Sequence, residues 1–338
     1  MGIGGYEIMK RDVYVFNNGT LVRKDNTLLL TIDEKKHYIP VETVESIHFF
    51  GEVDVNKSLL EFATQHEILL HYYNYYDYYI GTYYPREHLN SGYVLLQQCQ
   101  AYLDYDRRRY LARMFVAGAT QNMLQILKYY QRRKGNLETT IEEIQKLSEQ
   151  IDEQETIEQI MAIEGNIHKV YYQAFNVILN QTAFYFSQRS KRPPKDRINA
   201  LISFGNTIVY NTALSQIYQT QLDPRIGYLH TTNQRRFSLN LDIAELFKPI
   251  LVDRTIFSLL NRKQITAKDF QNELGGILLK DRGRKIFVQA IDEKLCTTVQ
   301  LKSIAHRVSY KTLIRMEVYK IQKYLTEGCA YEPFVMEW

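Results

Sequence analysis

The hydrophobic pattern of this chain changes its period once, near residue 90, and this change limits the folds open to it. Residues 12–84 carry short apolar runs separated by turn residues, such as Val13–Phe16 before an Asn-Asn-Gly turn. Such runs are typical of strands in a small β-sandwich. From Ser91 onwards, apolar residues recur at helical spacing almost to the end. We therefore predict an α+β protein, with a small β-sandwich domain over residues 1–90 and a larger all-α domain over residues 91–338.

Three local patterns add detail to this outline. Leu59–His66 reads as one short helix packed against the strands. The tyrosine-rich stretch over residues 72–84 could stack on bases, but tyrosines in strands more often fill half-buried sheet faces or dimer interfaces. Gly275–Phe287 reads as a small hairpin with Asp281-Arg282-Gly283 at its tip.

Composition narrows the class of protein. A chain of 338 residues with 45% hydrophobic and 24% charged residues is expected to fold, not to be disordered. No apolar run approaches the roughly 18–20 residues of a membrane span, and the first ten residues lack a secretory core, so we predict a cytoplasmic protein that does not enter membranes. The three cysteines are too few and too scattered for a thiolate metal site. Any metal would therefore be held by carboxylates and histidine, which favours Mg²⁺ or Mn²⁺.

The basic residues are clustered although the net charge is only +4. Separated charge of this kind allows a nucleic-acid footprint on one face, while each cluster alone could equally be a solvated helix surface. The clusters are Arg107–Arg109, Arg132–Lys134, Arg189–Arg197, Arg235-Arg236 and Lys280–Lys285.

Glu164 is the residue that most needs an explanation. It shares one face of a predicted helix with apolar residues, and the opposite face is apolar too, so the glutamate is expected to be buried. A buried charge is costly unless a metal or a counter-charge compensates it. Gly165 costs about 1 kcal/mol in a helix interior, which indicates that something approaches the backbone closely there.

Two further candidates have credible structural explanations. Asp242 and Glu245 are three positions apart and would share one side of a helix. Asn240 could cap that helix, and acidic residues in a first turn stabilise its dipole without any function. His230 alone is more often a satisfied structural histidine than a ligand.

Four stretches of the chain, taken together and in their order along the sequence, nevertheless resemble the signature of a known family. This family is the CRISPR-associated integrase, a metal-dependent DNA endonuclease of spacer acquisition. The departures from the family pattern are His168 for alanine, Lys169 and Lys248 for arginine, and Glu245 where many members carry aspartate. The matching stretches are Glu164-Gly165 with Tyr171, Arg192–Leu201, Asp223–His230 and Asp242–Pro249.

The resemblance implies a metal site with catalytic ligands Glu164, His230 and Glu245, supported by Asp242. It would bind Mg²⁺ or Mn²⁺, and Tyr171 and Asn199 would support it. We expect DNA to be bound by basic residues, most of which lie beside these motifs in sequence. They are Arg189, Lys191, Arg192, Lys195, Arg235, Arg236 and Lys248.

The implied reaction is a transesterification, and the implied enzyme class is that of hydrolases acting on phosphodiester bonds. A prespacer 3′-hydroxyl would attack a repeat-boundary phosphodiester in a CRISPR array, within prokaryotic adaptive immunity against mobile DNA. The implied partners are double-stranded DNA, a second copy of the chain joined through the β domains, and a small ferredoxin-like adaptation protein. Two alternatives stay open: a nuclease that acts alone on branched or single-stranded DNA, and a DNA-binding platform without chemistry.

Overall fold

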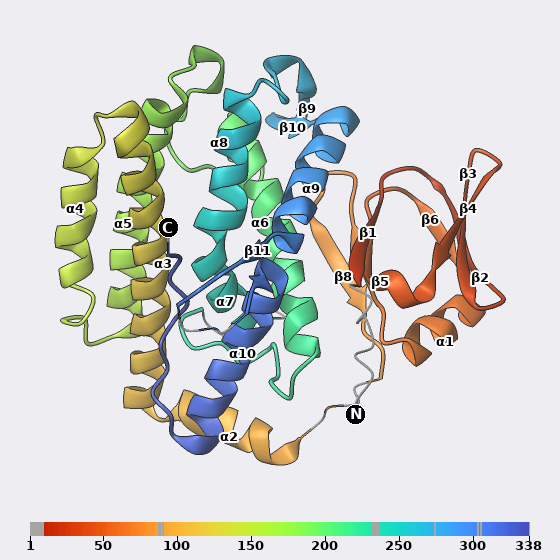
Figure 1. Ribbon diagram of the computed structural model, residues 1–338, viewed down its shortest axis with the longest axis horizontal. Helices are drawn as coiled ribbons and strands as arrows, with labels where there is room; N and C mark the ends of the chain where they lie inside the picture. Colours follow the sequence, from red (N-terminus) through yellow and green to blue (C-terminus); the bar gives the residue numbers. More distant parts are fainter. Residues whose placement is uncertain are drawn as a thin grey trace. The chain divides into compact units, whose positions relative to one another are not determined.

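The computed structural model describes residues 10–86, 89, 91–230, 237–273, 275–302, 304 and 306–337. The chain divides into two compact units, Met1–His88 and Leu89–Trp338. Figure 1 shows the first unit built from strands and one helix, and the second built mainly from helices. The predicted α+β class is therefore confirmed.

The first unit contains two four-stranded sheets. One has the order β1-β5-β7-β8, in which β5 runs parallel to β1 and β7, and the other has the order β4-β3-β2-β6. Apolar side chains from both sheets and from α1 form one core, as in the expected sandwich. The elements are β1 (Arg11–Val15), β2 (Gly19–Lys24), β3 (Thr27–Ile32), β4 (Lys35–Pro40), β5 (Val44–Phe49), β6 (Val53–Val55), α1 (Lys57–Gln65), β7 (Leu69–Tyr73) and β8 (Tyr79–Tyr83).

Both local expectations for this unit are confirmed. The short helix is α1, and Leu59 and Phe62 on it are buried in the core. The tyrosine-rich stretch forms β7 and β8, and Tyr73 is buried against Phe50, with ring centroids 4.1 Å apart.

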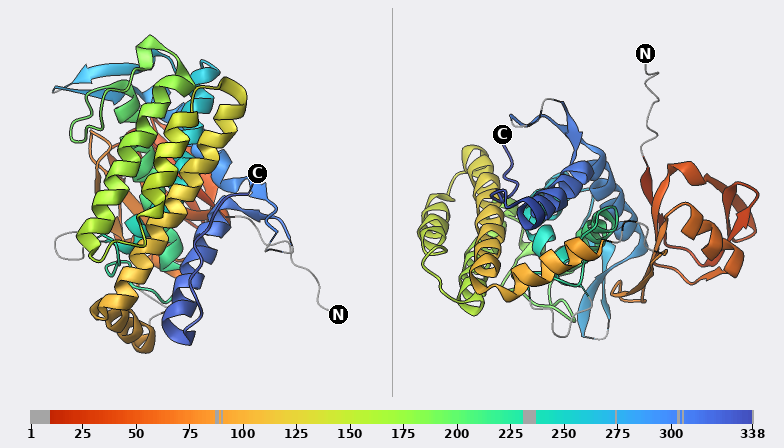
Figure 2. Two further views of the ribbon diagram at one scale, coloured as in Figure 1. Left: turned by 90° about the vertical axis from the view of Figure 1, so that its left-hand side faces the viewer. Right: turned by 90° about the horizontal axis from the view of Figure 1, so that it is seen from below.

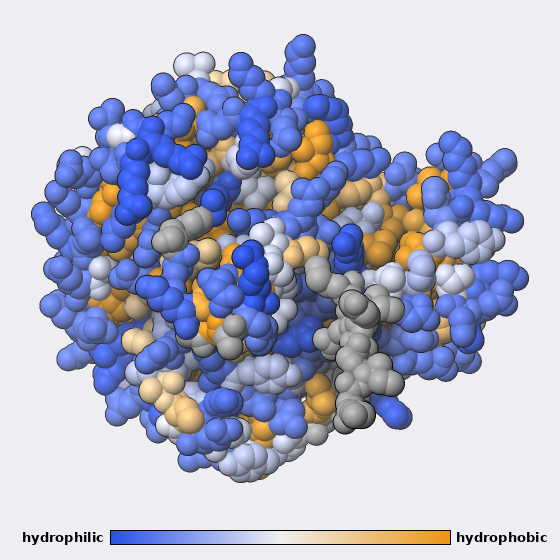
Figure 3. Space-filling view, viewed as in Figure 1, coloured by the Kyte–Doolittle hydropathy of each residue, from blue (hydrophilic) through white to orange (hydrophobic). Residues whose placement is uncertain are grey.

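The second unit is a helical assembly. In Figures 1 and 2, α3, α4 and α5 lie side by side, and α7 packs against both α3 and α6. Its surface is mainly hydrophilic in the view of Figure 3, as expected when the apolar helix faces point inwards. The helices are α2 (Gly92–Leu103), α3 (Tyr105–Lys134), α4 (Glu138–Glu149), α5 (Ile157–Leu179), α6 (Arg197–Tyr218), α7 (Leu239–Lys248), the π-helix η3 (Pro249–Asp253), α8 (Arg254–Asn261), α9 (Asp281–Cys296) and α10 (Tyr310–Glu327).

Two short sheets interrupt this helical unit, so "all-α" describes only its main body. They pair β9 (Phe270–Glu273) with β10 (Gly276–Leu279), and β11 (Thr298–Val299) with β12 (Val308–Ser309). The predicted hairpin with Asp281-Arg282-Gly283 at its tip is wrong: the hairpin lies earlier, and Asp281 begins α9. The apolar spacing of Phe287, Ile291 and Leu295, all buried, shows why a helix forms there.

Helix α5 is amphipathic, not apolar all round. A capping box formed by Thr156 and Gln159 starts it, and Asn180 in the left-handed conformation ends it. Ile160 and Ile167 are buried, but Gly165 on the opposite face is exposed. Glu164 sits at the boundary between the two faces, with 12% of its side chain exposed.

The carboxy-terminal segment, residues 329–337, packs against α7. Asn122 on α3 donates its amide to the carbonyl oxygens of Leu246 and Phe334, both at 2.9 Å. The Phe334 ring stacks on Phe247, with centroids 5.0 Å apart. The end of the chain thus fixes α7, the helix that carries three of the predicted site residues.

Candidate metal centre

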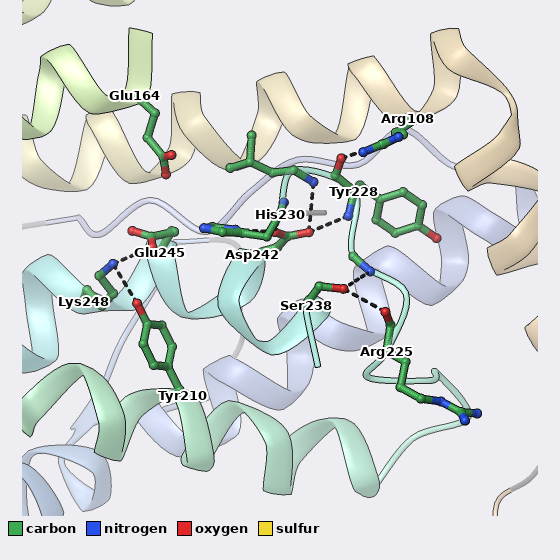
Figure 4. Close-up of polar contacts among 12 residues, drawn as sticks. Arg108, Glu164, Tyr210, Arg225, Tyr228, His230, Ser238, Asp242, Glu245 and Lys248 are labelled. Atoms are coloured by element: carbon green, nitrogen blue, oxygen red, sulfur yellow. Dashed lines mark hydrogen bonds and ion pairs between the residues drawn. The ribbon is translucent and has the colours of Figure 1, made fainter. Parts of the chain in front are cut away.

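Two helices and one connecting segment bring the predicted site residues together. Figure 4 shows the Glu164 carboxylate pointing from its helix towards the side chains of His230 and Glu245. The contributing elements are α5, with Glu164 and His168, the segment before α7, with His230, and α7 itself, with Asp242, Glu245 and Lys248.

Asp242 is fully buried and its carboxylate is saturated with hydrogen bonds. Its Oδ2 accepts from the backbone amides of Tyr228 and Leu229 at 2.6 and 3.2 Å, and its Oδ1 accepts from the amide of His230 at 3.0 Å. Oδ1 also accepts from the His230 ring at 2.8 Å. Since a carboxylate can only accept, Nδ1 of His230 carries a proton, and the neutral ring therefore has its lone pair on Nε2, where a ligand can bind.

The segment before α7 must approach that helix closely for these bonds to form. A Cβ on Gly227 would lie 2.7 Å from the Ser238 carbonyl carbon and 2.9 Å from Asp242 Oδ2, which only glycine avoids. Ser238 Oγ accepts from the Gly227 amide and donates to the Arg225 carbonyl, both at 2.8 Å. Arg108 on α3 donates to the Tyr228 carbonyl at 3.1 Å. Hydrogen bonds to the backbone of Gly227–His230 therefore fix this stretch against α7 and hold His230 in position.

Glu164 and Glu245 face one another at the centre of the site. Together with His168 they offer three ligand atoms that all lie within 4.8 Å of one another. His168 Nε2 lies 4.0 Å from Glu164 Oε1 and 3.4 Å from Glu245 Oε2. Burial and the neighbouring Glu245 charge raise the pKa of Glu164, whereas Lys248 and the two histidines hold the pKa of Glu245 low against its burial.

Lys248 neutralises Glu245 from the side away from Glu164. Its ammonium donates to Glu245 Oε1 at 2.5 Å and to the Tyr210 hydroxyl at 3.4 Å. Although its burial acts in the opposite direction, the Glu245 charge raises the pKa of Lys248 well above its usual value. Lys248 is 6% exposed, so a contact to a DNA phosphate requires this ion pair to open.

The helical unit contains a further buried acid, Asp253. Asp253 on η3 is 2% exposed, and burial raises its pKa to about 7 against the lowering effects of Lys248 and the Tyr171 hydroxyl. Tyr171 is itself 1% exposed. Its hydroxyl lies close enough to Asp253 to lower the pKa of that acid.

The residues present fit a divalent cation. Two adjacent buried carboxylates repel one another unless a cation lies between them. Within the described part of the chain, Glu245 Oε2 is buried without a hydrogen-bond partner, and such an orphaned oxygen is rare. Carboxylate oxygens bind both Mg²⁺ and Mn²⁺. Each imidazole nitrogen added to the site favours Mn²⁺ over Mg²⁺.

The seven predicted DNA-binding residues differ in their surroundings, and one of them, Lys248, forms the ion pair with Glu245 described above. Arg189 donates to the Asn199 side chain at 2.8 Å, and Asn199, fully buried, donates to the Gln188 carbonyl at 2.8 Å, so both brace the loop before α6. Lys191, Arg192 and Lys195 on that loop are exposed. Arg235 and Arg236 lie outside the described residues.

Sequence spacing already points to the neighbours of both carboxylates. The position of His168 one turn after Glu164 predicts that it can touch that carboxylate, and its Nε2 lies 4.0 Å from Glu164 Oε1. The spacing of three between Glu245 and Lys248 allows the intrahelical ion pair that the structure contains, and a contact of Lys248 with DNA stays a prediction.

Comparison with known proteins identifies the chain. The family model described as CRISPR associated protein Cas1 matches residues 13–293. A curated relative, CRISPR-associated endonuclease Cas1 2 of Thermodesulfovibrio yellowstonii, is 53% identical over 330 residues. The match covers 98% of this chain and 100% of the relative. These matches define a CRISPR-associated nuclease.

Within that class, the chain belongs to the Cas1 family. The solved structure of a Cas1 protein from Thermotoga maritima superimposes with a TM-score of 0.85 at 43% identity, over 97% of this chain and 99% of that one. A casposase solved bound to an integration product has the same fold, with a TM-score of 0.85 at 18% identity over 96% and 92% of the two chains. Among the described residues, no helix is long and apolar enough to cross a membrane.

Proposed function

We propose that this Cas1-family chain joins DNA fragments to a CRISPR array by metal-dependent transesterification. The observation that carries the proposal is the pair of adjacent, largely buried carboxylates, Glu164 and Glu245. His230 is close enough for its charge to lower the pKa of both, and its Nδ1, not its Nε2, is held by Asp242. The family supplies the nuclease class, and the named casposase relative, solved with an integration product, makes the joining direction a reasonable extension.

In this proposal Glu164, His230 and Glu245 hold a Mg²⁺ or Mn²⁺ ion. When bound, the ion supplies charge neutralisation at the reacting phosphodiester. The chain's own residues prepare the site for it. Asp242 fixes the His230 ring and its tautomer, and Lys248 keeps Glu245 ionised.

The exposed surface beside Glu164 is where we place the DNA. A Cβ built on Gly165 would meet no described atom within 4 Å beyond the helix's own backbone. This open space lets a phosphodiester reach the carboxylate past a residue without a side chain. The exposed basic loop with Lys191, Arg192 and Lys195, and Arg235 and Arg236, would contact the backbone of the duplex.

The partners are part of the same proposal. We infer a cytoplasmic homodimer formed through the β units, and a complex with the small ferredoxin-like adaptation protein. Light scattering of the purified chain, alone and with the adaptation protein, tests both expectations.

The decisive experiment is a strand-joining assay with a prespacer duplex and a supercoiled repeat-containing plasmid. Glu164→Ala and His230→Ala should abolish joining while DNA binding and the oligomeric state persist. Joining at the wild-type rate in either variant would refute the metal assignment. Cleavage of branched DNA without the adaptation protein, and no joining when it is present, would favour a nuclease that acts alone.

A further inference from the structure

His168 departs from the alanine that the family pattern usually has at this position. It lies one turn after Glu164 on α5, and its Nε2 reaches the space between the two carboxylates. Only 18% of its side chain is exposed. A histidine at this point adds a nitrogen donor to a site otherwise rich in oxygen.

The surroundings of His168 fix its ring and place its Nε2 beside both carboxylates. The Tyr172 ring lies against it, with centroids 5.6 Å apart and planes 23° from parallel. At 3.4 Å, the Nε2 to Glu245 Oε2 distance is longer than an ordinary hydrogen bond, and Oε2 is buried without a hydrogen-bond partner among the described residues. Nε2 and Glu245 Oε2 thus face each other without a well-formed hydrogen bond between them.

The two histidines of the site differ in how they are held. His230 is locked by its 2.8 Å bond to Asp242, whereas the nearest carboxylate oxygen lies 3.4 Å from His168 Nε2, and His168 Nδ1 has no hydrogen-bond partner among the described residues. Either tautomer of His168 is therefore accessible, including the one with its lone pair on Nε2, towards the carboxylates.

We propose that His168 is a fourth protein ligand of the metal ion that Glu164, His230 and Glu245 hold, and that it shifts the preference of the site towards Mn²⁺ over Mg²⁺. This inference rests on the proposed function. Nitrogen donors bind first-row transition ions better than Mg²⁺, which prefers oxygen and retains its water. A fourth protein ligand therefore strengthens Mn²⁺ binding more than Mg²⁺ binding.

The competing explanation is that His168 acts only as a counter-charge to the acids. In that case an arriving ion would displace a protonated imidazole. Removing the ring would then tighten the binding of both ions, and to a similar extent. The two explanations predict opposite signs for the same variant.

Isothermal titration calorimetry with Mn²⁺ and with Mg²⁺ separates them, on the full-length chain and its His168→Ala variant. We expect His168→Ala to weaken Mn²⁺ binding about tenfold or more, and Mg²⁺ binding less than about threefold. His37→Ala, which removes an exposed histidine on β4, is the matched control and should change neither affinity. An unchanged Mn²⁺ to Mg²⁺ affinity ratio, or tighter binding of both ions, overturns the proposal.

A spectroscopic count of nitrogen ligands provides a readout independent of affinity. Electron spin-echo envelope modulation of bound Mn²⁺ should detect two imidazole nitrogens in the wild type, and one in either His168→Ala or His230→Ala. A wild-type ion with one nitrogen ligand, lost only in His230→Ala, refutes the role of His168 and leaves the proposed function intact. A wild type that binds no Mn²⁺ at these residues contradicts the proposed function itself.

Discussion

Asp242 and Glu245 lie one turn apart on α7, and both are buried, yet their surroundings are opposite. Asp242 accepts hydrogen bonds from three backbone amides and one imidazole. Glu245 has one oxygen paired with Lys248, and its other oxygen has no hydrogen-bond partner in the described chain and lies 3.4 Å from His168 Nε2. A saturated acid holds the scaffold together, whereas an unsaturated acid beside a second carboxylate is ready to bind a cation.

Asp253 shows a third outcome for a buried acid. Its Oδ1 also lacks a hydrogen-bond partner among the described residues, but burial raises its pKa to about 7, so a proton neutralises much of its charge near neutral pH. Glu245 instead is kept ionised by neighbouring positive charge. The three acids therefore separate by how their charge is compensated: by amides, by a proton, or by a cation.

The comparison predicts its largest effect at Glu245. Glu245→Gln keeps the shape of the side chain but removes the charge that would hold the ion. Metal affinity should fall by more than the roughly 10–100-fold that the loss of an outer-shell partner costs, and strand joining should be lost. Calorimetry with Mn²⁺ measures this, and retention of wild-type affinity would mean that Glu245 is not a ligand.

The next largest effect should be on the free energy of unfolding, when Lys248 is removed. Lys248→Met leaves the Glu245 charge buried without its partner, so we expect the free energy of unfolding to fall by about 3–5 kcal/mol in EDTA. Saturating Mn²⁺ should recover part of this loss, because the ion replaces the missing charge.

The matched control for that experiment is Lys57→Met. Lys57 forms an exposed pair with Glu61 at 3.3 Å, and its loss should change stability by no more than about 0.5 kcal/mol. Urea unfolding with and without Mn²⁺ gives all four values. Equal, small losses in both variants would show that Glu245 does not depend on a counter-charge.

Asp253 should make stability depend on pH in a defined direction. Because its folded pKa is raised from 3.8 to about 7, the folded state retains a proton that the unfolded state releases. Its contribution is therefore complete below about pH 4 and declines as pH rises through 7, by about 1.4 kcal/mol per pH unit.

Asp253→Asn isolates this effect from other titrating groups. The stability of the variant relative to the wild type should increase between pH 5 and pH 7 by roughly 2 kcal/mol and level off above pH 7. Urea unfolding at several pH values in EDTA measures the difference. A pH-independent difference would place the folded pKa of Asp253 near its usual range.

Removal of the Asp242 charge should change stability less than removal of Lys248. Asp242→Asn retains one acceptor oxygen but places an amide against backbone donors, which should cost about 1–3 kcal/mol. His230 would lose its fixed tautomer, so Mn²⁺ affinity should fall about 10–100-fold. Thermal unfolding and calorimetry measure both. An effect on metal binding as large as that of Glu245→Gln would erase the distinction between scaffold and ligand.

The sequence predicted the parts of this molecule that depend on local pattern. Period and turn residues located the β unit, α1, and the strands of the tyrosine-rich stretch. The same reasoning misplaced the hairpin near Gly275, because the charged residues after Asp281 read as a turn while they in fact form the exposed first turn of α9.

Tertiary contacts, which a sequence pattern does not contain, decide which site residues are candidate ligands and which are supports. The roles of Asp242 and Glu245 look equivalent at a spacing of three, and only the packing of the segment before α7 gives Asp242 its amide donors. The burial of Lys248 depends on Tyr210 on another helix, and the position of α7 depends on Phe334, which is distant in sequence. Motif spacing named the residues of the site but did not divide them into ligands and supports.

Anomalous diffraction from crystals of the protein soaked in Mn²⁺ tests the central claim most directly. The account predicts one strong anomalous peak bounded by Glu164, His230 and Glu245, with Asp242 outside the coordination sphere and still bonded to His230. Absence of a peak between Glu164 and Glu245 at saturating Mn²⁺, or a peak coordinated by Asp242 in place of Glu245, would contradict it.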